Sequence, residues 1–241
     1  MSRWSERGTR AGGRHGRPWR AAGAAAVALT AVLGAGLLGV GLTGSEPARP
    51  PQPIVGAGTL PATAYPDVTG IDPDVDVAPE SDDSGETVGM ARSEPTTITI
   101  PRIGVDASIM SLGVEADGTV QVPPLQQAQL AGWYRLGATP GEVGNAVIVG
   151  HVDSSYIGPA VFYDLGALLP GDTINVARQD GSTATFRVDA VRSYPKTEFP
   201  TELVYGPNDR AALRVVTCGG KFDEKARDYL DNVIVFATLV I

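Results

Sequence analysis

Short apolar runs separated by turn residues dominate the chain beyond Thr96. Each run is rich in Val and Ile and is bounded by Gly, Pro, Asp or Asn, a pattern typical of β-strands. The clearest predicted strands cover residues 97–100, 146–149, 172–176, 183–188, 213–217 and 233–237. The Asp180-Gly181 pair between the third and fourth runs predicts a tight hairpin turn.

This pattern indicates an all-β fold with few helices. Six to eight strands in a domain of about 145 residues favour a closed barrel, because closure removes the exposed edges of a sheet. The candidate helices are short and cover residues 126–131 and 161–169. The folded domain is predicted to span residues 96–241.

The hydropathy pattern changes at the N-terminus. Residues 1–20 carry six arginines and one acid, whereas residues 21–43 carry no charge. Twenty-three uncharged residues are enough to cross about 30 Å of hydrocarbon as a helix. The positive-inside rule then predicts a basic cytoplasmic tail, a single transmembrane signal anchor and an extracytoplasmic remainder. The alternative is a cleaved signal peptide, because the stretch is rich in Ala and Gly and ends in small residues.

Residues 44–95 join the predicted anchor to the predicted domain. They are rich in Pro and Asp and lack apolar periodicity, which predicts a disordered, extended extracytoplasmic linker. The Asp run from Asp72 to Asp83 lacks the Gly and the distal Glu of a calcium loop, so a solvated linker is the favoured interpretation.

Composition narrows the class of partner. The net charge is -8, and no basic cluster occurs outside the first twenty residues, which argues against nucleic acid as a partner. Beyond Thr96 there is no GxGxxG, GxxxxGK or HExxH motif. We therefore expect no metal and no cofactor.

Two residues carry the candidate chemistry. Cys218 is the only cysteine, and His151 is the only histidine besides His15 in the basic tail. Each follows an apolar run and lies next to glycine. A lone exported cysteine is buried and inert, paired with another chain, or kept for its reactivity. A neighbouring imidazole favours the last interpretation, because it activates the thiol and protonates a leaving amine.

Several separated segments resemble one enzyme family. The segment from Leu213 to Gly220 resembles the signature of sortases, a Thr-Cys pair at the end of an apolar strand, and Val149 to Ser154 resembles their Gly-His segment. The wider context is similar to the class F sortases of actinobacteria, and the resemblance covers residues 98–241. The further matching segments are 131–134, 139–142, 169–172, 194–196 and 231–235.

The resemblance implies an eight-stranded barrel with a Cys-His-Arg site. Cys218 would be the nucleophile and His151 its acid/base partner. The expected substrate is an exported protein with a C-terminal LPXTG-like sorting signal, which forms a thioacyl enzyme. An amine acceptor of a peptidoglycan precursor or of the cell envelope would then resolve the thioacyl enzyme, with hydrolysis as the side reaction. The predicted anchor at residues 21–43 places the protein at the cell membrane, with the catalytic domain outside.

The arginine is less clear from the sequence. Class F members commonly carry Tyr-Arg-Asp-Asn before the last strand, whereas this chain has Leu230 at the arginine position. Arg227 follows Cys218 by nine residues (227 minus 218), a spacing that other sortase classes use, and is the predicted third member of the site. Arg214 is the alternative, and an enzyme without an essential arginine is a further one.

Other roles and functions stay open at this point. Asn232 is a candidate donor to the oxyanion, and Asp153 and Ser154 are candidates to orient the imidazole or to cap a turn. Four aromatic side chains are candidates for a peptide groove or for the core: Trp133, Tyr134, Phe162 and Tyr194. The competing functions are an enzyme like the L,D-transpeptidases, whose His and Cys lie close in sequence, and an inactive surface β-module.

Overall fold

The computed structural model describes residues 49–54, 58, 60 and 89–240. The chain divides into two units, Met1–Ala48 and Arg49–Ile241, and the described residues belong to the second. The predicted cytoplasmic tail, the predicted anchor at 21–43 and most of the predicted linker therefore lie outside the described residues. Within the described part, no helix has the length and hydrophobicity needed to cross a membrane.

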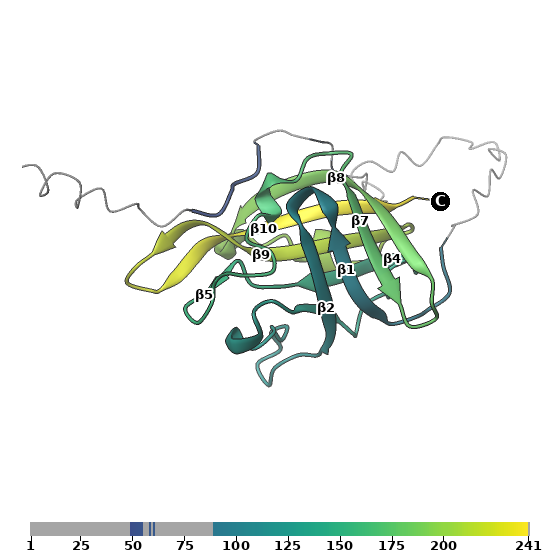
Figure 1. Cartoon of the computed structure of the whole chain (residues 1–241), viewed down its shortest axis with the longest axis horizontal. Helices are drawn as coiled ribbons and strands as arrows, with labels where there is room; N and C mark the ends of the chain where they lie inside the picture. Colours follow the sequence, from purple (N-terminus) through teal and green to yellow (C-terminus); the bar gives the residue numbers. More distant parts are fainter. Residues whose placement is uncertain (1–48, 55–57, 59, 61–88, 241) are drawn as a thin grey trace, which may run out of the picture. The chain divides into compact units, whose positions relative to one another are not determined.

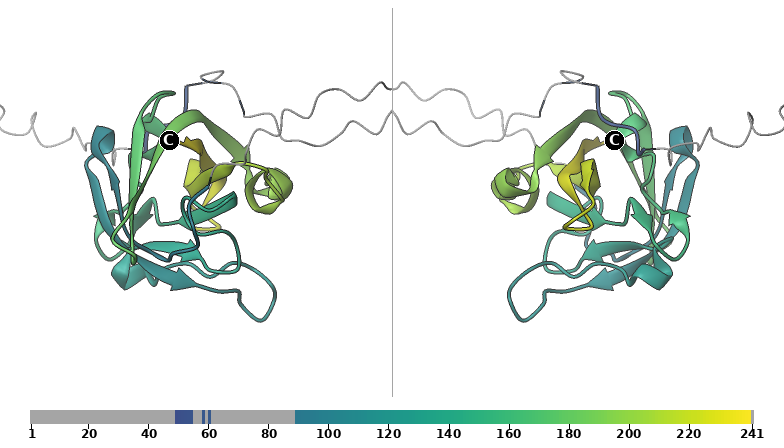
Figure 2. Two further views of the ribbon diagram at one scale, coloured as in Figure 1. Left: turned by 90° about the vertical axis from the view of Figure 1, so that its right-hand side faces the viewer. Right: turned by 90° about the vertical axis from the view of Figure 1, so that its left-hand side faces the viewer.

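Eight strands close into a barrel in the order β1-β2-β3-β4-β9-β10-β8-β7 (Figures 1 and 2). Neighbouring strands are antiparallel except in the pairs β2–β3 and β4–β9, which are parallel. A separate two-stranded sheet joins β5 and β6. The strands are β1 (Pro95–Ile100), β2 (Val105–Leu112), β3 (Ala131–Tyr134), β4 (Gly144–Val149), β5 (Asp153–Ser154), β6 (Gly158–Pro159), β7 (Thr173–Arg178), β8 (Thr183–Pro195), β9 (Ala211–Asp223) and β10 (Asp228–Leu239).

The barrel confirms the prediction of an all-β, closed eight-stranded fold. Each of the six predicted strands overlaps an observed strand, and β2 and β3 are additional. The Asp180-Gly181 turn joins β7 to β8, and Gly181 has a φ of +83°, which a residue with a side chain rarely adopts.

Each of the two predicted helical segments, 126–131 and 161–169, contains only a short 3₁₀ helix. These are η2 (Leu125–Gln127) and η3 (Leu165–Ala167). Such short segments have too little intrinsic helicity to decide their own conformation, so tertiary contacts decide it. In the second segment, Leu165 and Leu168 are buried in the barrel core. The remaining short helices are η1 (Pro101–Ile103), η4 (Lys196–Glu198) and α1 (Thr201–Tyr205). None of these three was predicted.

Two apolar clusters lie on opposite faces of the barrel wall. The larger cluster takes side chains from all eight barrel strands, including Trp133 and Phe186, and fills the interior. The smaller one includes Val147, Val216 and Phe236, and packs against α1 outside the barrel (Figure 2). Since the middle parts of β4, β9 and β10 are covered on both faces, each contains an apolar run without polar alternation, at 146–149, 215–216 and 233–237.

Parts of the predicted linker contact the barrel. The Gly220 N–H donates to Gln52 Oε1 at 2.9 Å, and the Met90 N–H donates to the Gly141 carbonyl at 2.7 Å. These described residues therefore differ from the predicted free spacer, because their polar groups have partners in the barrel.

Candidate active site

The parallel pair β4–β9 brings the candidate nucleophile and the candidate acid/base residue to one level of the barrel. Its register runs from Gly144 opposite Ala211 to Val149 opposite Val216. Two hydrogen bonds continue the pairing beyond β4: the Gly150 N–H donates to Val216 O at 3.1 Å, and Thr217 Oγ1 donates to Gly150 O at 2.8 Å. His151 follows Gly150, and Cys218 follows Thr217. The two residues therefore continue neighbouring strands, whose usual backbone spacing is about 4.8 Å.

The imidazole of His151 is oriented by the backbone. Its Nε2 lies 2.6 Å from the carbonyl oxygen of Pro123, and its own carbonyl accepts the N–H of Phe162 at 3.0 Å. Because a carbonyl only accepts hydrogen bonds, this contact requires the hydrogen on Nε2. Nδ1 is then the nitrogen left to exchange a proton at the site.

Cys218 lies among charged groups from three different elements. Burial raises the pKa of its thiol above the ordinary value, and the Asp228 and Asp153 carboxylates act in the same direction. The Lys196 ammonium opposes them, and its charge lowers the pKa. Sequence reasoning gave Lys196 no role, because it lies on another strand path, 22 residues before Cys218 (218 minus 196).

Asp153 does not orient the imidazole in this structure. Its carboxylate accepts a short hydrogen bond from the Tyr229 hydroxyl, linking β5 to β10. Burial and this bond raise the pKa of Tyr229, so the phenol stays protonated. Ser154 Oγ donates to Leu125 O at 2.9 Å and accepts the Tyr156 N–H at 3.2 Å, which ties the loop beside the site to the segment before β3.

Arg227 occupies the turn between β9 and β10 with a φ of +54°, next to the pair formed by Asp223 and Asp228. The charges that act most on the pKa of the Cys218 thiol belong to Lys196, Asp228 and Asp153. The catalytic role of Arg227 stays a prediction.

The alternative, Arg214, has a buried side chain that contacts structural partners. It is 1 % exposed, donates from Nε to Leu203 O at 3.0 Å, and stacks over the Phe236 ring at 4.9 Å. Burial lowers its pKa to about 10, against the charge of Asp189. It precedes Cys218 by four residues, about 13 Å along the strand. Arg214 thus fastens α1 to the outer face of β9.

The other candidates divide between core and site. Trp133 and Phe162 are buried in the barrel interior, whereas Tyr134 and Tyr194 pack in the outer cluster. Asn232 is paired directly with Cys218 across β9 and β10, and with Tyr194 on the other side.

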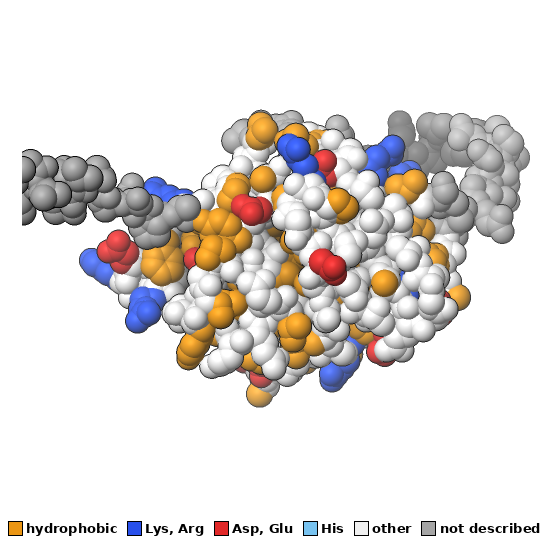
Figure 3. Space-filling view, in the orientation of Figure 1, with side chains coloured by type: hydrophobic (Ala, Val, Ile, Leu, Met, Phe, Trp, Pro, Cys, Tyr) orange, Lys and Arg blue, Asp and Glu red, His pale blue; other side chains and the backbone are white. Residues whose placement is uncertain are grey.

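Exposed apolar side chains surround the candidate site. They come from the β9–β10 hairpin and from the loop after β5, and the same area of the surface shows hydrophobic side chains at the left of Figure 3. Their exposed fractions are 43 % for Phe222, 48 % for Leu230, 63 % for Tyr156 and 44 % for Ile157.

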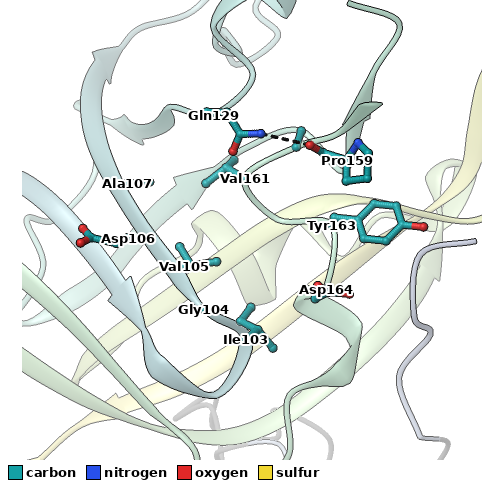
Figure 4. Close-up of a pocket in the computed structure, with 11 residues that line it drawn as sticks. Ile103, Gly104, Val105, Asp106, Ala107, Gln129, Pro159, Val161, Tyr163 and Asp164 are labelled. Carbon is teal, nitrogen blue, oxygen red and sulfur yellow. Dashed lines mark hydrogen bonds between the residues drawn. The ribbon is translucent and has the colours of Figure 1, made fainter. Parts of the chain in front are cut away.

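A separate pocket of about 230 Å³ opens between the start of β2 and the segment around Pro159 (Figure 4). Gln129 Nε2 donates to Pro159 O across its upper wall. Neither Cys218, His151 nor Lys196 lines it, so the pocket is not the site of the thiol chemistry. Among the described residues, no group of His, Cys, Asp and Glu side chains is arranged to hold a metal ion.

Comparisons with known proteins agree on one domain type. A family model described as the sortase domain matches residues 98–240. Among solved structures, a sortase D5 transpeptidase from Clostridium perfringens has 24 % identity and a TM-score of 0.46, covering 63 % of this chain and 83 % of its own. A sortase A lid mutant from Corynebacterium diphtheriae has 20 % identity and a TM-score of 0.46, covering 63 % and 73 % respectively. Sortase C-1 from Actinomyces oris has 22 % identity and a TM-score of 0.46, covering 61 % and 76 %. No curated protein matches the chain.

Proposed function

Because the chain belongs to the sortase family of cysteine transpeptidases, we propose that Cys218 is its nucleophile and His151 its acid/base group. The observation that carries this assignment is the parallel pairing of β4 with β9, continued by the bond from Thr217 Oγ1 to Gly150 O. The pairing supports a shared site, because it sets the residues that follow the two strands at one level.

The proposed reaction has two halves. The Cys218 sulfur gives its proton to His151 and attacks the carbonyl carbon of the donor peptide, and the carbonyl π electrons move to oxygen. The carbonyl then re-forms, the C–N bond breaks, and the leaving amine takes the proton from His151. In the second half an acceptor amine attacks the thioester and gives a proton to His151. The carbonyl re-forms, the C–S bond breaks, and the Cys218 sulfur takes the proton from His151. Water in place of the amine gives hydrolysis.

The proposed donor is an exported protein that ends in an LPXTG-like sorting signal. The proposed acceptor is an amine of a peptidoglycan precursor or of another envelope component. Exposed Leu230 and Tyr156 support binding of the apolar part of such a peptide. We place the chain with class F, on the motifs that it shares with that class, and we expect its source to be an actinobacterium.

The proposed location is the cell membrane. Residues 1–20 would form a cytoplasmic tail, 21–43 a single-pass anchor, 44–95 an extracytoplasmic linker and 96–241 the catalytic domain. The support is the charge pattern of the sequence, with six arginines immediately before 23 uncharged residues.

The test uses the purified full-length chain and a quenched fluorescent LPXTG-type peptide with hydroxylamine as the acceptor. We expect hydroxamate product and, without acceptor, an acyl adduct on Cys218 detectable by mass spectrometry. Cys218→Ala should form neither, and His151→Ala should lose most of the turnover. Equal turnover by the parent chain and Cys218→Ala would contradict the assignment.

A further inference from the structure

Strand order brings Lys196 to the nucleophile. The strands β8, β10 and β9 are neighbours in the barrel, and their registers align Tyr194, Asn232 and Cys218 in one row across the sheet. Lys196 follows Tyr194 by two residues, where β8 ends and η4 begins. From this position the charge of its ammonium group acts on the Cys218 thiol and lowers the pKa of that thiol.

Asp228 holds the ammonium group of Lys196 in place. Lys196 Nζ lies 2.7 Å from each of the two carboxylate oxygens of Asp228, the first residue of β10. The lysine side chain is 31 % exposed and the aspartate side chain 55 % exposed. An ion pair this open to solvent contributes little to folding stability. Its main effect is therefore to fix a positive charge beside the thiol.

Lys196 carries the positive charge that acts most on the Cys218 thiol. Its charge lowers the pKa of Cys218, against the carboxylates of Asp228 and Asp153. Arg227 is at the hairpin turn, and Arg214 is bound to Leu203 and Phe236. The position that the family resemblance assigns to arginine is Leu230, which carries no charge.

We propose that Lys196 is a catalytic residue that supplies the positive charge of the site, in place of an arginine. The inference rests on the proposed role of Cys218 as nucleophile. When sulfur attacks the donor carbonyl, negative charge passes from sulfur to the carbonyl oxygen, which is bonded to the attacked carbon. The ammonium donates a hydrogen bond to the thiolate and then to the oxyanion, and keeps its own proton throughout. His151 carries the proton between the thiol and the leaving amine, so the two residues have separate tasks.

The roles of Lys196 and Arg227 are separable by substitution in the full-length chain. Lys196→Met and Lys196→Gln remove the charge, and we expect each to lower kcat/KM for the LPXTG-type peptide by about 100-fold, as for loss of an oxyanion donor. Lys196→Arg should restore most of the activity. Lys225→Met removes a lysine charge from the hairpin turn, away from the thiol, and should change kcat/KM by less than about twofold. Near-UV circular dichroism checks that every variant is folded.

A second readout needs no peptide. The rate of alkylation of Cys218 by iodoacetamide, followed against pH, gives the apparent pKa of the thiol. We expect Lys196→Met to raise this pKa, and Lys196→Arg to return it toward that of the parent chain. If the parent does not turn over the peptide, the proposed donor is wrong, while alkylation still tests Lys196.

Two results would overturn the proposal. One is an unchanged alkylation profile in both neutral variants, with kcat/KM within about threefold of the parent. The other is a larger loss of kcat/KM in Arg227→Met than in Lys196→Met, which would return the role to the arginine.

Discussion

Gly150 is the residue at which the packing of the barrel sets the position of His151. A Cβ atom at Gly150 would lie 2.5 Å from Cδ2 of Phe162 and 2.7 Å from Cγ1 of Val161. Both neighbours belong to the barrel core, and Phe162 is fully buried. The N–H of Phe162 also donates to the carbonyl of His151. The change Gly150→Ala therefore pushes the backbone before His151 away from Phe162, whose N–H bonds to the carbonyl of His151.

The size of the displacement follows from the contact distances. Carbon atoms in contact lie at about 3.5 Å or more, so the new methyl group requires a shift of about 1 Å. Overpacking of this kind costs about 1–3 kcal/mol, and the loss of glycine freedom in the unfolded chain returns about 0.4–1 kcal/mol. A net loss of about 1–2 kcal/mol lowers the Tm of a domain this size by about 2–8 °C. A misplacement of about 1 Å in a catalytic group costs about 100-fold in rate.

The assay compares stability and activity in one variant. We expect Gly150→Ala to remain folded at 25 °C, with the small loss of Tm given above, while kcat/KM for the peptide falls about 100-fold. Gly113→Ala is the matched control, because its Cβ would meet only the guanidinium of Arg135, the free end of a flexible side chain. This control should keep both Tm and kcat/KM close to the parent values.

Activity of folded Gly150→Ala within about twofold of the parent would contradict the expected displacement of about 1 Å. An equal loss of activity in Gly113→Ala would also contradict it, because the effect would then not come from the contact with Phe162.

Three further predictions concern core packing and titration. Phe186→Ala should lower the free energy of unfolding in urea by about 3–5 kcal/mol, because the ring is fully buried, whereas exposed Phe222→Ala should change it by less than about 0.5 kcal/mol. Burial raises the pKa of Cys218, so its alkylation by iodoacetamide should accelerate at a higher pH than that of a free cysteine, and an equal or lower midpoint would contradict this. Burial also raises the pKa of Glu142, but hydrogen bonds from Thr139 and the charge of Arg92 outweigh it and hold this pKa below 4.5. A depressed pKa stabilises the fold above the pKa of the unfolded chain, and this stability is lost as the pH falls through the pKa of the folded chain. Glu142→Gln should therefore lose less stability than the parent on acidification below a pH of about 4.5. Identical acid-unfolding profiles of the two proteins would exclude a stabilising role for the Glu142 carboxylate.

The amino-acid sequence by itself determined the elements of the barrel and the two residues most suited to its chemistry. Alternation, Val and Ile content and the Asp180-Gly181 turn are local signals, because each depends on the backbone preferences of neighbouring residues. They predicted six strands and one hairpin correctly. The same signals predicted two helical segments that are longer than the 3₁₀ helices observed. In the second, contacts of Leu165 and Leu168 with the distant core override weak local helicity.

Only the tertiary structure decided which side chains meet at the thiol. His151 and Cys218 are 67 residues apart (218 minus 151), and the parallel pairing of β4 with β9 places the two at one level. Lys196 lies at the end of a strand that β10 alone separates from β9, the strand of Cys218, whereas Arg227, much nearer in sequence, lies in the turn of the β9–β10 hairpin. Spacing along the chain cannot give these distances, because they depend on long-range strand pairing. That pairing is selected by the closure of the barrel together with the burial of both faces of β4, β9 and β10.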